Sequence, residues 1–239
     1  MDHEPIPTDT ADTNRRLRIK IAARSVVRFS IVVLVLFLTA GRVDYWQGWI
    51  FTVIFGILLI SSLIQFSDRI DLAMERLRPG PGIKWWDRIF IAFYLPLSIG
   101  IFVVGGLDAG RFGWTRDLPI WVYPVSIVVC VGSFCFTRWA MLTNRWFSSV
   151  VRIQTDRGQR VVREGPYRFV RHPGYLGIIL SFMAVPLILG SLWALIPAGS
   201  VSLLLIVRTC LEDRILQEEL AGYADYAQEV RYRLLPRVW

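Results

Sequence analysis

Apolar runs alternate with short polar segments over the first 140 residues of the chain. Runs that are this apolar and this poor in charge are typical of membrane-crossing helices rather than of a soluble core. Tryptophans near the run ends are typical of anchors at the membrane interface. The pattern predicts four membrane spans, at residues 29–40, 46–66, 89–107 and 119–140, with a kink at Pro96 in the third.

A further apolar run covers residues 176–207 and is too long for one span, which needs about 20 residues. Gly190 and Ser191 break this run near its middle, and Pro186 and Pro197 weaken each half. We therefore expect a helical hairpin whose two ends lie at the same membrane face. The predicted fold class is all-α: a polytopic transmembrane bundle of four spans plus a C-terminal helical hairpin, with a small cytoplasmic cofactor-binding region.

Polar segments flank these runs. Residues 1–14 are polar and acidic and contain two prolines, which predicts a disordered tail. Residues 67–88 form a predicted loop, because the Arg-Pro-Gly-Pro-Gly run at 78–82 cannot hold a regular helix. The chain is thus expected to divide into a cytoplasmic basic tail (1–28), a four-span region (29–140) and a cofactor-binding catalytic region (141–239).

The positive charge is distributed unevenly between the two sides of this topology. With the N-terminus in the cytoplasm, 24 of the 27 Lys and Arg residues fall on the cytoplasmic side, and only Arg42, Arg111 and Arg116 fall outside. This positive-inside pattern explains the net charge of +8 without a nucleic-acid partner. It predicts a multi-pass protein of the inner (cytoplasmic) membrane, in contact with membrane lipids and with both termini in the cytoplasm.

Cysteine and histidine usage narrows the chemistry. The three cysteines, Cys130, Cys135 and Cys210, lie in or beside apolar runs and form no Cys-x-x-Cys pair, so neither a zinc site nor a disulfide framework is indicated. With only two histidines in the chain, one of them at position 3, we expect no His-based metal site.

Residues 165–177 stand where the polar connection 141–175 enters the hairpin. Pro173 disfavours helical geometry at His172 and suits the first position of a helix. The free N–H groups and positive dipole of that helix start would attract an anionic group. Gly174 and Gly177 would let a ligand approach the backbone. The alternative is an ordinary loop-to-helix junction in which the arginines contact lipid headgroups.

A charged helix is predicted to leave the membrane after the hairpin. Arg208–Glu212 and Arg214–Glu218 are spaced as i,i+4 ion pairs, and Asp213 and Glu219 add further carboxylates. A solvated helix with exposed ion pairs would account for such a run. The hairpin, however, would return Arg208 to the membrane face of His172. The two groups would then border one chamber suited to a zwitterion with an extra cation, such as S-adenosylmethionine.

Within the polar connection, residues 156–159 have the composition of a turn. Residues 150–154 and 160–162 on either side of that turn are rich in valine and isoleucine, which predicts two short extended pieces.

The motif order in this half of the chain resembles the isoprenylcysteine carboxyl methyltransferase family, and phospholipid N-methyltransferases are similar in the same region. The motifs are Gly-Pro-Tyr167, Arg171-His-Pro-Gly-Tyr175-x-Gly177, an apolar hairpin, Asp213-Arg-x-x-x-Glu-Glu219, Tyr223-x-x-Tyr226 and Leu-Leu-Pro. The resemblance implies an S-adenosylmethionine site made of Gln154, Gln159, Arg160, Val161, Val162, Tyr167, His172, Pro173, Gly174, Tyr175, Glu218 and Glu219. It further implies that Arg214 lies near the methyl acceptor. Arg171, beside His172, is the second candidate catalytic residue, and its partner is left open between the cofactor, the acceptor and lipid headgroups.

The expected activity is therefore transfer of a methyl group from S-adenosylmethionine to a lipophilic small-molecule or prenylated acceptor, with an isoprenylcysteine-like carboxylate as the first candidate. Alternatives within this chemistry are a thiol acceptor and a phospholipid amine, the latter requiring a base that is not obvious in the chain. Alternatives outside it are a sterol-reductase-like enzyme that uses NADPH and a non-catalytic membrane scaffold.

Overall fold

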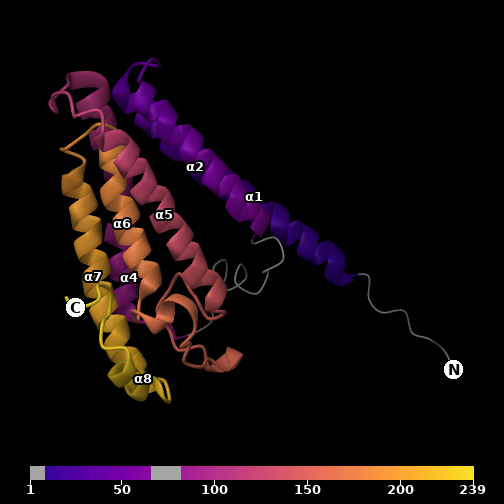
Figure 1. Cartoon of the computed structure of the whole chain (residues 1–239). Coiled ribbons are helices and arrows are strands. Elements are labelled where there is room, and N and C mark those ends of the chain that lie inside the picture. Colours follow the sequence, from indigo (N-terminus) through magenta and orange to yellow (C-terminus); the bar gives the residue numbers. More distant parts are fainter. Residues whose placement is uncertain (1–8, 66–81) are drawn as a thin grey trace.

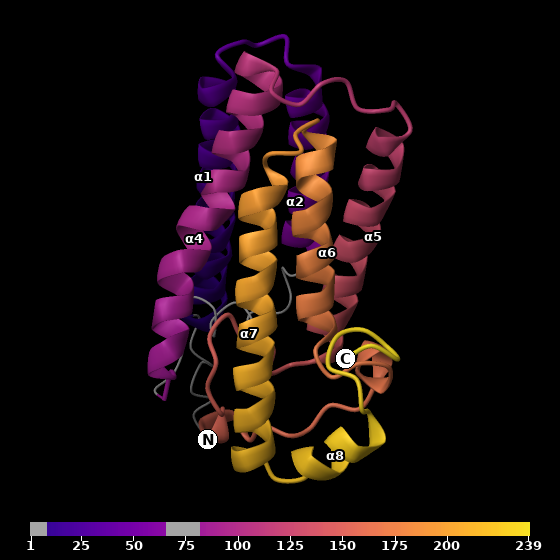
Figure 2. The ribbon, with the colours of Figure 1, turned by 90° about the vertical axis from the view of Figure 1, so that its left-hand side faces the viewer.

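The computed structural model describes residues 9–65 and 82–239, and these residues form an all-helical bundle (Figure 1). No strand occurs in the described part of the chain. Its α-helices are α1 (Asp9–Ala40), α2 (Trp46–Gln65), α4 (Trp85–Gly105), α5 (Val122–Thr143), α6 (Pro173–Ile188), α7 (Leu195–Glu219) and α8 (Tyr223–Glu229). Six of these helices run lengthwise through the bundle, and the short α8 lies across one end of it (Figure 2).

The outward faces of the long helices are apolar. Large side chains such as Ile57, Val128 and Leu203 are each about 60% exposed or more, as expected where lipid rather than water surrounds the protein. Five helices in the described residues are long and apolar enough to cross a membrane, and α6 adds a shorter apolar helix of 16 residues. The prediction of four spans plus a helical hairpin is confirmed as the architecture of the bundle.

Two helix starts differ from the sequence prediction. Helix α1 begins at Asp9, so that residues 9–14 are helical where a disordered tail was expected; residues 1–8 lie outside the described part. Helix α4 begins at Trp85 rather than at residue 89, because the carboxylate of Asp87 in its first turn is buried and bonded within the protein. The predicted irregular run at 78–82 lies outside the described residues except for Gly82.

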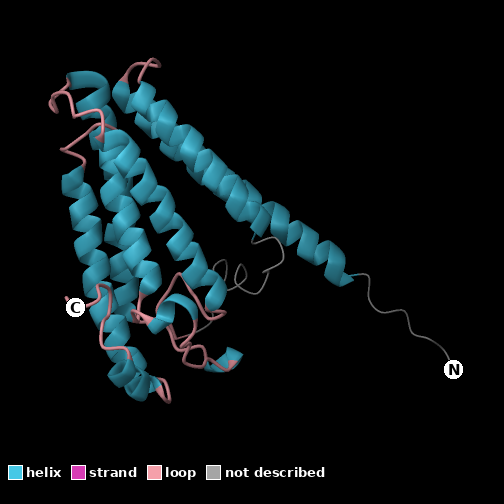
Figure 3. Ribbon diagram, viewed as in Figure 1, coloured by secondary structure: helices cyan, strands magenta, loops and turns pink. Residues whose placement is uncertain are grey.

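A π-helical segment, Gly106–Phe112, follows α4 at the end of the bundle far from α8 (Figure 3). The buried carboxylate of Asp108 accepts hydrogen bonds from the backbone N–H and hydroxyl of Thr115 and from the hydroxyl of Ser191, each 2.6 Å long. Gly190 has a φ of +74° and starts the turn between α6 and α7. The predicted break at Gly190 and Ser191 is therefore confirmed, and Asp108 fastens it to the rest of the bundle.

The hairpin of α6 and α7 places both of its open ends at the same end of the bundle. Helix α6 packs against α5 and α7 packs against α4 (Figure 2). Gly177 allows the first contact, because a Cβ there would lie 2.1 Å from the Thr137 hydroxyl and 2.8 Å from the Ser133 carbonyl oxygen. Pro186 and Pro197 lie within these helices and do not end them.

The connection between α5 and α6 folds beneath the open end of this hairpin. A 3₁₀ turn, Thr155–Arg157, is followed by Gly158 with a φ of +61°, and the predicted turn is thereby confirmed. The two pieces beside it, residues 150–154 and 160–162, do not pair as strands. Their backbone instead bonds to side chains: the N–H of Gln154 donates to the Gln159 side-chain oxygen over 2.7 Å.

Candidate functional site

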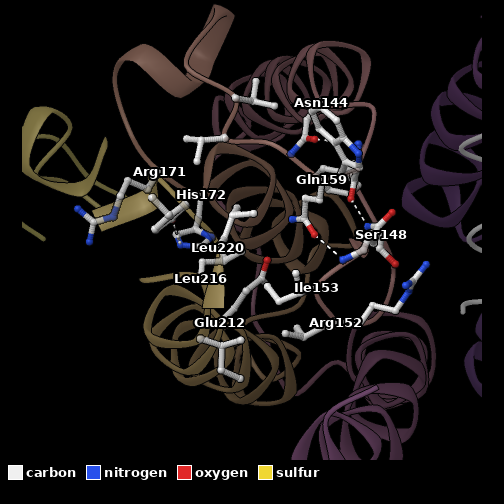
Figure 4. Close-up of a pocket in the computed structure, with 18 of the residues that line it drawn as sticks. Asn144, Ser148, Arg152, Ile153, Gln159, Arg171, His172, Glu212, Leu216 and Leu220 are labelled. Atoms are coloured by element: carbon white, nitrogen blue, oxygen red, sulfur yellow. Dashed lines mark hydrogen bonds between the residues drawn. The ribbon is translucent and has the colours of Figure 1, made fainter. Parts of the chain in front are cut away.

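A pocket opens at the end of the bundle where the α5–α6 connection, the start of α6, the end of α7 and α8 meet (Figure 4). It encloses about 850 Å³ of empty space, open solvent at its mouth included. Pockets of a few hundred to about 1,000 Å³ hold cofactors and other small molecules. The lining combines apolar side chains such as Ile153, Val161 and Leu216 with a few polar groups on the walls.

The start of α6 presents backbone donors to this pocket. His172 occupies the N-cap position with a φ of −124°, and Pro173 stands at the first helical position as predicted. The first helical N–H that has a backbone partner is that of Leu176, which donates to the His172 carbonyl oxygen over 3.2 Å. Gly174 and Tyr175 line the pocket, and their N–H groups have no acceptor among the described residues. This helix start is therefore suited to an anionic group.

Glu212 provides the only carboxylate in the described lining of the pocket. It reaches in from α7 towards the space that His172 borders from the other side (Figure 4). The hydroxyl of Tyr175 donates a hydrogen bond to Glu212 Oε2. The expected Arg208–Glu212 ion pair is not formed. A carboxylate thus faces a helix N-terminus across one pocket, which suits a zwitterionic ligand.

Asp213 lies directly behind this wall and is fully buried. Arg171 donates to both of its oxygens, from Nε to Oδ1 over 2.7 Å and from Nη2 to Oδ2 over 2.9 Å. His172, Tyr223, Gln217 and Arg233 also place a donor within 3.1 Å of the carboxylate. The guanidinium of Arg171 consequently points away from the cavity (Figure 4).

Tyr167, Leu220, Tyr223 and Tyr226 line the pocket as part of one buried cluster, against which Val161 and Val162 pack. Burial raises the pKa of the Tyr167 phenol above its ordinary value, and burial together with the nearby Asp213 carboxylate does the same for Tyr223. Both phenols are therefore neutral near pH 7. The Tyr167 hydroxyl accepts a hydrogen bond from Asn144 Nδ2 over 3.2 Å and donates none to a described residue.

The amide of Gln154 is used within the connection itself. Its Nε2 donates to the Trp146 carbonyl oxygen over 2.7 Å, and its oxygen accepts from Arg157 Nη1 over 2.5 Å. The side chain is 1% exposed although it lies in the pocket wall. Gln154 thus shapes the wall, and its polar atoms already have protein partners.

Most of the residues predicted for the site meet at this pocket. Those in its lining are Gln154, Gln159, Arg160, Val161, Val162, Tyr167, Arg171, His172, Gly174 and Tyr175. Pro173 starts α6 but does not line the pocket. The predicted residues on the last turns of α7, Arg214, Glu218 and Glu219, do not line it either. Arg214 pairs with Glu218 over 2.8 Å on the exposed side of that helix, and Glu219 pairs with Lys84 over 2.6 Å.

The sequence predicts Glu218 and Glu219 for the cofactor site, whereas the structure places Glu212 in the pocket. Helical periodicity turns Glu218 by about 120° from Glu212 around α7, but Glu219 follows Glu212 by about two turns on the same face. Periodicity alone therefore does not select Glu212, which lines the pocket together with Leu216. A similar pattern could not have identified Asn144 or Trp146, because their place in the lining depends on the course of an irregular connection.

A buried ion pair supports the pocket from the membrane side. Arg208 Nε lies 2.9 Å from Asp87 Oδ1, although the two atoms are not aligned as a hydrogen bond. Arg208 Nη2 donates to the Ser149 carbonyl oxygen over 2.9 Å, and the N–H of Val151 donates to Asp87 Oδ2 over 2.8 Å. The guanidinium lies 4.5 Å from the centre of the Phe90 ring. The pair thereby joins α4, α7 and the pocket wall.

The bundle and the pocket together define a polytopic membrane protein with a pocket of small-molecule size at one end of its helices. Residues 125–221 match the model of the isoprenylcysteine carboxyl methyltransferase (ICMT) family, so that this part of the chain is similar to that family.

Two curated rice proteins, from Oryza sativa subsp. indica and subsp. japonica, are similar to the chain. Each is described as a probable protein-S-isoprenylcysteine O-methyltransferase and is 26% identical over 115 residues, which cover 45% of this chain. The chain therefore spans little more than half, 58%, of the length of these relatives.

The fold is also similar to a solved structure of the eukaryotic intramembrane Ras methyltransferase ICMT. The TM-score is 0.55 at 17% sequence identity, over 92% of this chain and 80% of that one. At this identity the match shows a shared fold.

Proposed function

We propose that the protein is an integral membrane methyltransferase that uses S-adenosylmethionine and acts on a lipophilic acceptor. The pocket carries this proposal, because most of its lining falls in residues 125–221, which match the family model, and because it brings a helix N-terminus and one carboxylate to a single cavity. The names of the two rice relatives make an isoprenylcysteine carboxylate the first candidate for the acceptor.

The donor set fits the proposed cofactor. The amino-acid end of S-adenosylmethionine carries a carboxylate and an ammonium, for which the N–H groups of Gly174 and Tyr175 and the carboxylate of Glu212 are complementary partners. The apolar wall of Ile153 and Val161 is suited to the adenine ring of the cofactor. The other charged side chains in the described lining are arginines, so Glu212 is the group that would attract the positive charge of the ligand.

Methyl transfer to a carboxylate is an in-line displacement at the carbon of the sulfonium methyl group, which the cofactor supplies when bound. A carboxylate acceptor needs no base, so the chain has to align the two reactants and exclude water. The buried neutral phenol of Tyr167 and the side chains of Leu220 and Tyr226, which line the pocket beside it, provide such a dry surface. An amine acceptor would require proton removal, which makes this set of residues a poorer match to phospholipid N-methylation.

The acceptor is proposed to reach the pocket beside α4 and α7, where Phe90, Val201 and Leu205 form an apolar cluster next to Tyr175. The predicted role of Arg214 near the acceptor stays a prediction; its guanidinium is 78% exposed and bonded to Glu218. Arg208 is the cation nearer to this path, since it lies 5.6 Å from the centre of the Tyr175 ring.

Titration calorimetry with S-adenosylhomocysteine tests the cofactor site. We expect the intact protein to bind this product, Glu212→Gln to bind it about tenfold more weakly, and the matched control Glu218→Gln to bind it as the intact protein does, because a charged hydrogen bond is worth about 1.5–3 kcal/mol. Absence of binding by the intact protein, or an equal loss in both variants, would refute this site.

Radiolabelled methyl transfer separates the acceptors. Label should enter a synthetic farnesylcysteine carboxylate in preference to a phospholipid amine or a free thiol. A thermal-shift comparison of S-adenosylhomocysteine with NADPH addresses the reductase alternative, for which only NADPH would stabilise the protein. A scaffold without catalytic activity would label none of the acceptors in a total membrane extract.

A further inference from the structure

The carboxylate of Asp213 contacts the pocket only through its neighbours. It does not line the cavity, yet His172, which does, lies 3.1 Å from it through Nε2. The same ring nitrogen lies 3.4 Å from the Tyr223 hydroxyl, which itself donates to Asp213 Oδ1 over 3.1 Å. A carboxylate oxygen only accepts hydrogen bonds when ionised, so the proton of the imidazole belongs on Nε2.

The remaining ring nitrogen, Nδ1, makes no hydrogen bond to a described residue. Nδ1 is not one of the fully buried polar atoms that lack a partner, which means that it keeps some solvent access. Because His172 lines the pocket, this access is from the pocket. With the proton on Nε2, Nδ1 is the acceptor of the ring. The pocket therefore contains one acceptor that protein groups leave unused.

Two arginines already share the carboxylate of Asp213 with His172. Arg171 and Arg233 are permanent cations, and both already bond to this one carboxylate, at 2.7 and 2.9 Å. A protonated His172 would put a third positive charge on a single buried negative charge. The C-terminal segment helps to hold this arrangement, because the N–H groups of Arg171 and His172 each donate over 2.9 Å to carbonyl oxygens of residues 232 and 233.

We propose that Asp213 is a positioning residue: it holds His172 in the tautomer with the proton on Nε2, so that Nδ1 accepts a hydrogen bond from the ammonium group of the bound cofactor. This inference rests on the proposed function for the identity of the ligand, whereas the tautomer itself is a property of the protein alone. The amino-acid end of the ligand would then lie between the N-terminus of α6, His172 Nδ1 and Glu212.

Nitrogen NMR of the full chain in detergent, labelled at histidine, tests the tautomer. The chain has two histidines, so a His3→Gln background leaves the signals of His172 alone. We expect a proton on Nε2 and none on Nδ1, and we expect Asp213→Asn to move the proton, at least in part, to Nδ1. A doubly protonated ring, a proton on Nδ1 in the parent protein, or an unchanged ring in Asp213→Asn would each overturn the proposal.

Ligand binding tests the role of Nδ1. Decarboxylated S-adenosylhomocysteine has the ammonium group and 5′-methylthioadenosine lacks it, so the ratio of their affinities isolates that group. Asp213→Asn should lower this ratio about tenfold, as is common when the partner that orients a histidine is removed. Asp108→Asn changes an equally buried carboxylate at the other end of the bundle and should leave the ratio unchanged; equal ratios in all three proteins would contradict the proposal.

The NMR measurement and the binding measurement still test the proposal if a variant does not fold or if the proposed function fails. In the parent protein the Nδ1 signal should shift with the decarboxylated ligand and not with 5′-methylthioadenosine, and a shift with both or with neither refutes the contact. If no adenosyl ligand binds at all, the proposed function fails, while the ring signals of the free protein still decide whether Asp213 sets the tautomer.

Discussion

Single residues of α7 divide between two environments within a few positions. Arg208 and Asp213 are buried and bonded to other elements, whereas Arg214 and Glu218 are exposed and, among the described residues, bonded only to each other. Formal charge is the same in both cases, and burial decides what each charge contributes. An exposed pair is worth about 0–1 kcal/mol, whereas breaking a buried pair leaves a charge without compensation.

We expect Arg208→Ala to lower the free energy of unfolding by about 3–5 kcal/mol, because Asp87 would remain buried without its cation. The exposed counterpart, Arg214→Ala, should change it by less than about 1 kcal/mol. Denaturant titration in detergent measures both. Replacing the pair together, as Asp87→Leu with Arg208→Met, should recover part of the loss; a double variant as unstable as Arg208→Ala would contradict this account.

Much of the site could be predicted from the sequence, because its residues occupy short motifs on either side of the hairpin. The choice between the two acidic pairs of α7 could not, since Glu212–Asp213 and Glu218–Glu219 both suit a helix that leaves the membrane. What separates them is where the cavity ends along α7. That limit is set by the irregular connection 144–162, whose course depends on contacts such as that of Val151 with Asp87.

At the scale of elements, the contact between α5 and α6 sets the position of the pocket wall. Gly177 permits that contact, whereas at Gly199 in α7 a Cβ would meet only open space. The helices themselves and the break at Gly190 followed from apolar pattern and turn chemistry. The π-helical segment Gly106–Phe112 did not, because it depends on tertiary bonds from Asp108 to Thr115 and Ser191.

Gly177→Ala should destabilise the protein by about 1–3 kcal/mol, because its Cβ would meet the Ser133 backbone oxygen at 2.8 Å and the helices would have to separate. For a chain of this size that loss corresponds to a fall in Tm of about 2–12 °C. Gly199→Ala is the control and should leave Tm unchanged or raise it slightly, since alanine favours a helix. A thermal scan in detergent measures both Tm values. Equal Tm values for the two variants would contradict the prediction and show that α5 and α6 can move apart at little cost.

At the scale of the whole molecule, helix lengths place the pocket at the membrane boundary. Helix α6 has 16 residues and α7 has 25, which at about 1.5 Å per residue gives roughly 24 and 38 Å against a hydrocarbon core of about 30 Å. With the turn at Gly190 near one boundary, α6 would begin close to the other, and α7 would extend beyond it. A polar ligand from the aqueous side and an apolar acceptor from the bilayer would then meet at the same depth.

The chain passes along the bundle six times, in α1, α2, α4, α5, α6 and α7, so the end of α7 lies at the same end of the bundle as the start of α1. The pocket and the start of α1 therefore share one side of the membrane (Figure 1). Among the basic residues that the structure describes, only Arg42, Arg111 and Arg116 lie at the opposite end, which predicts that the pocket faces the cytoplasm. In a bacterial host, green fluorescent protein fused after Trp239 should therefore fluoresce, and alkaline phosphatase should be active when inserted between residues 113 and 118 but inactive after Trp239. The reverse pattern would separate the pocket from the cytoplasmic supply of its proposed cofactor, and the methyltransferase proposal would then fail on topology, whatever the affinity measured in detergent.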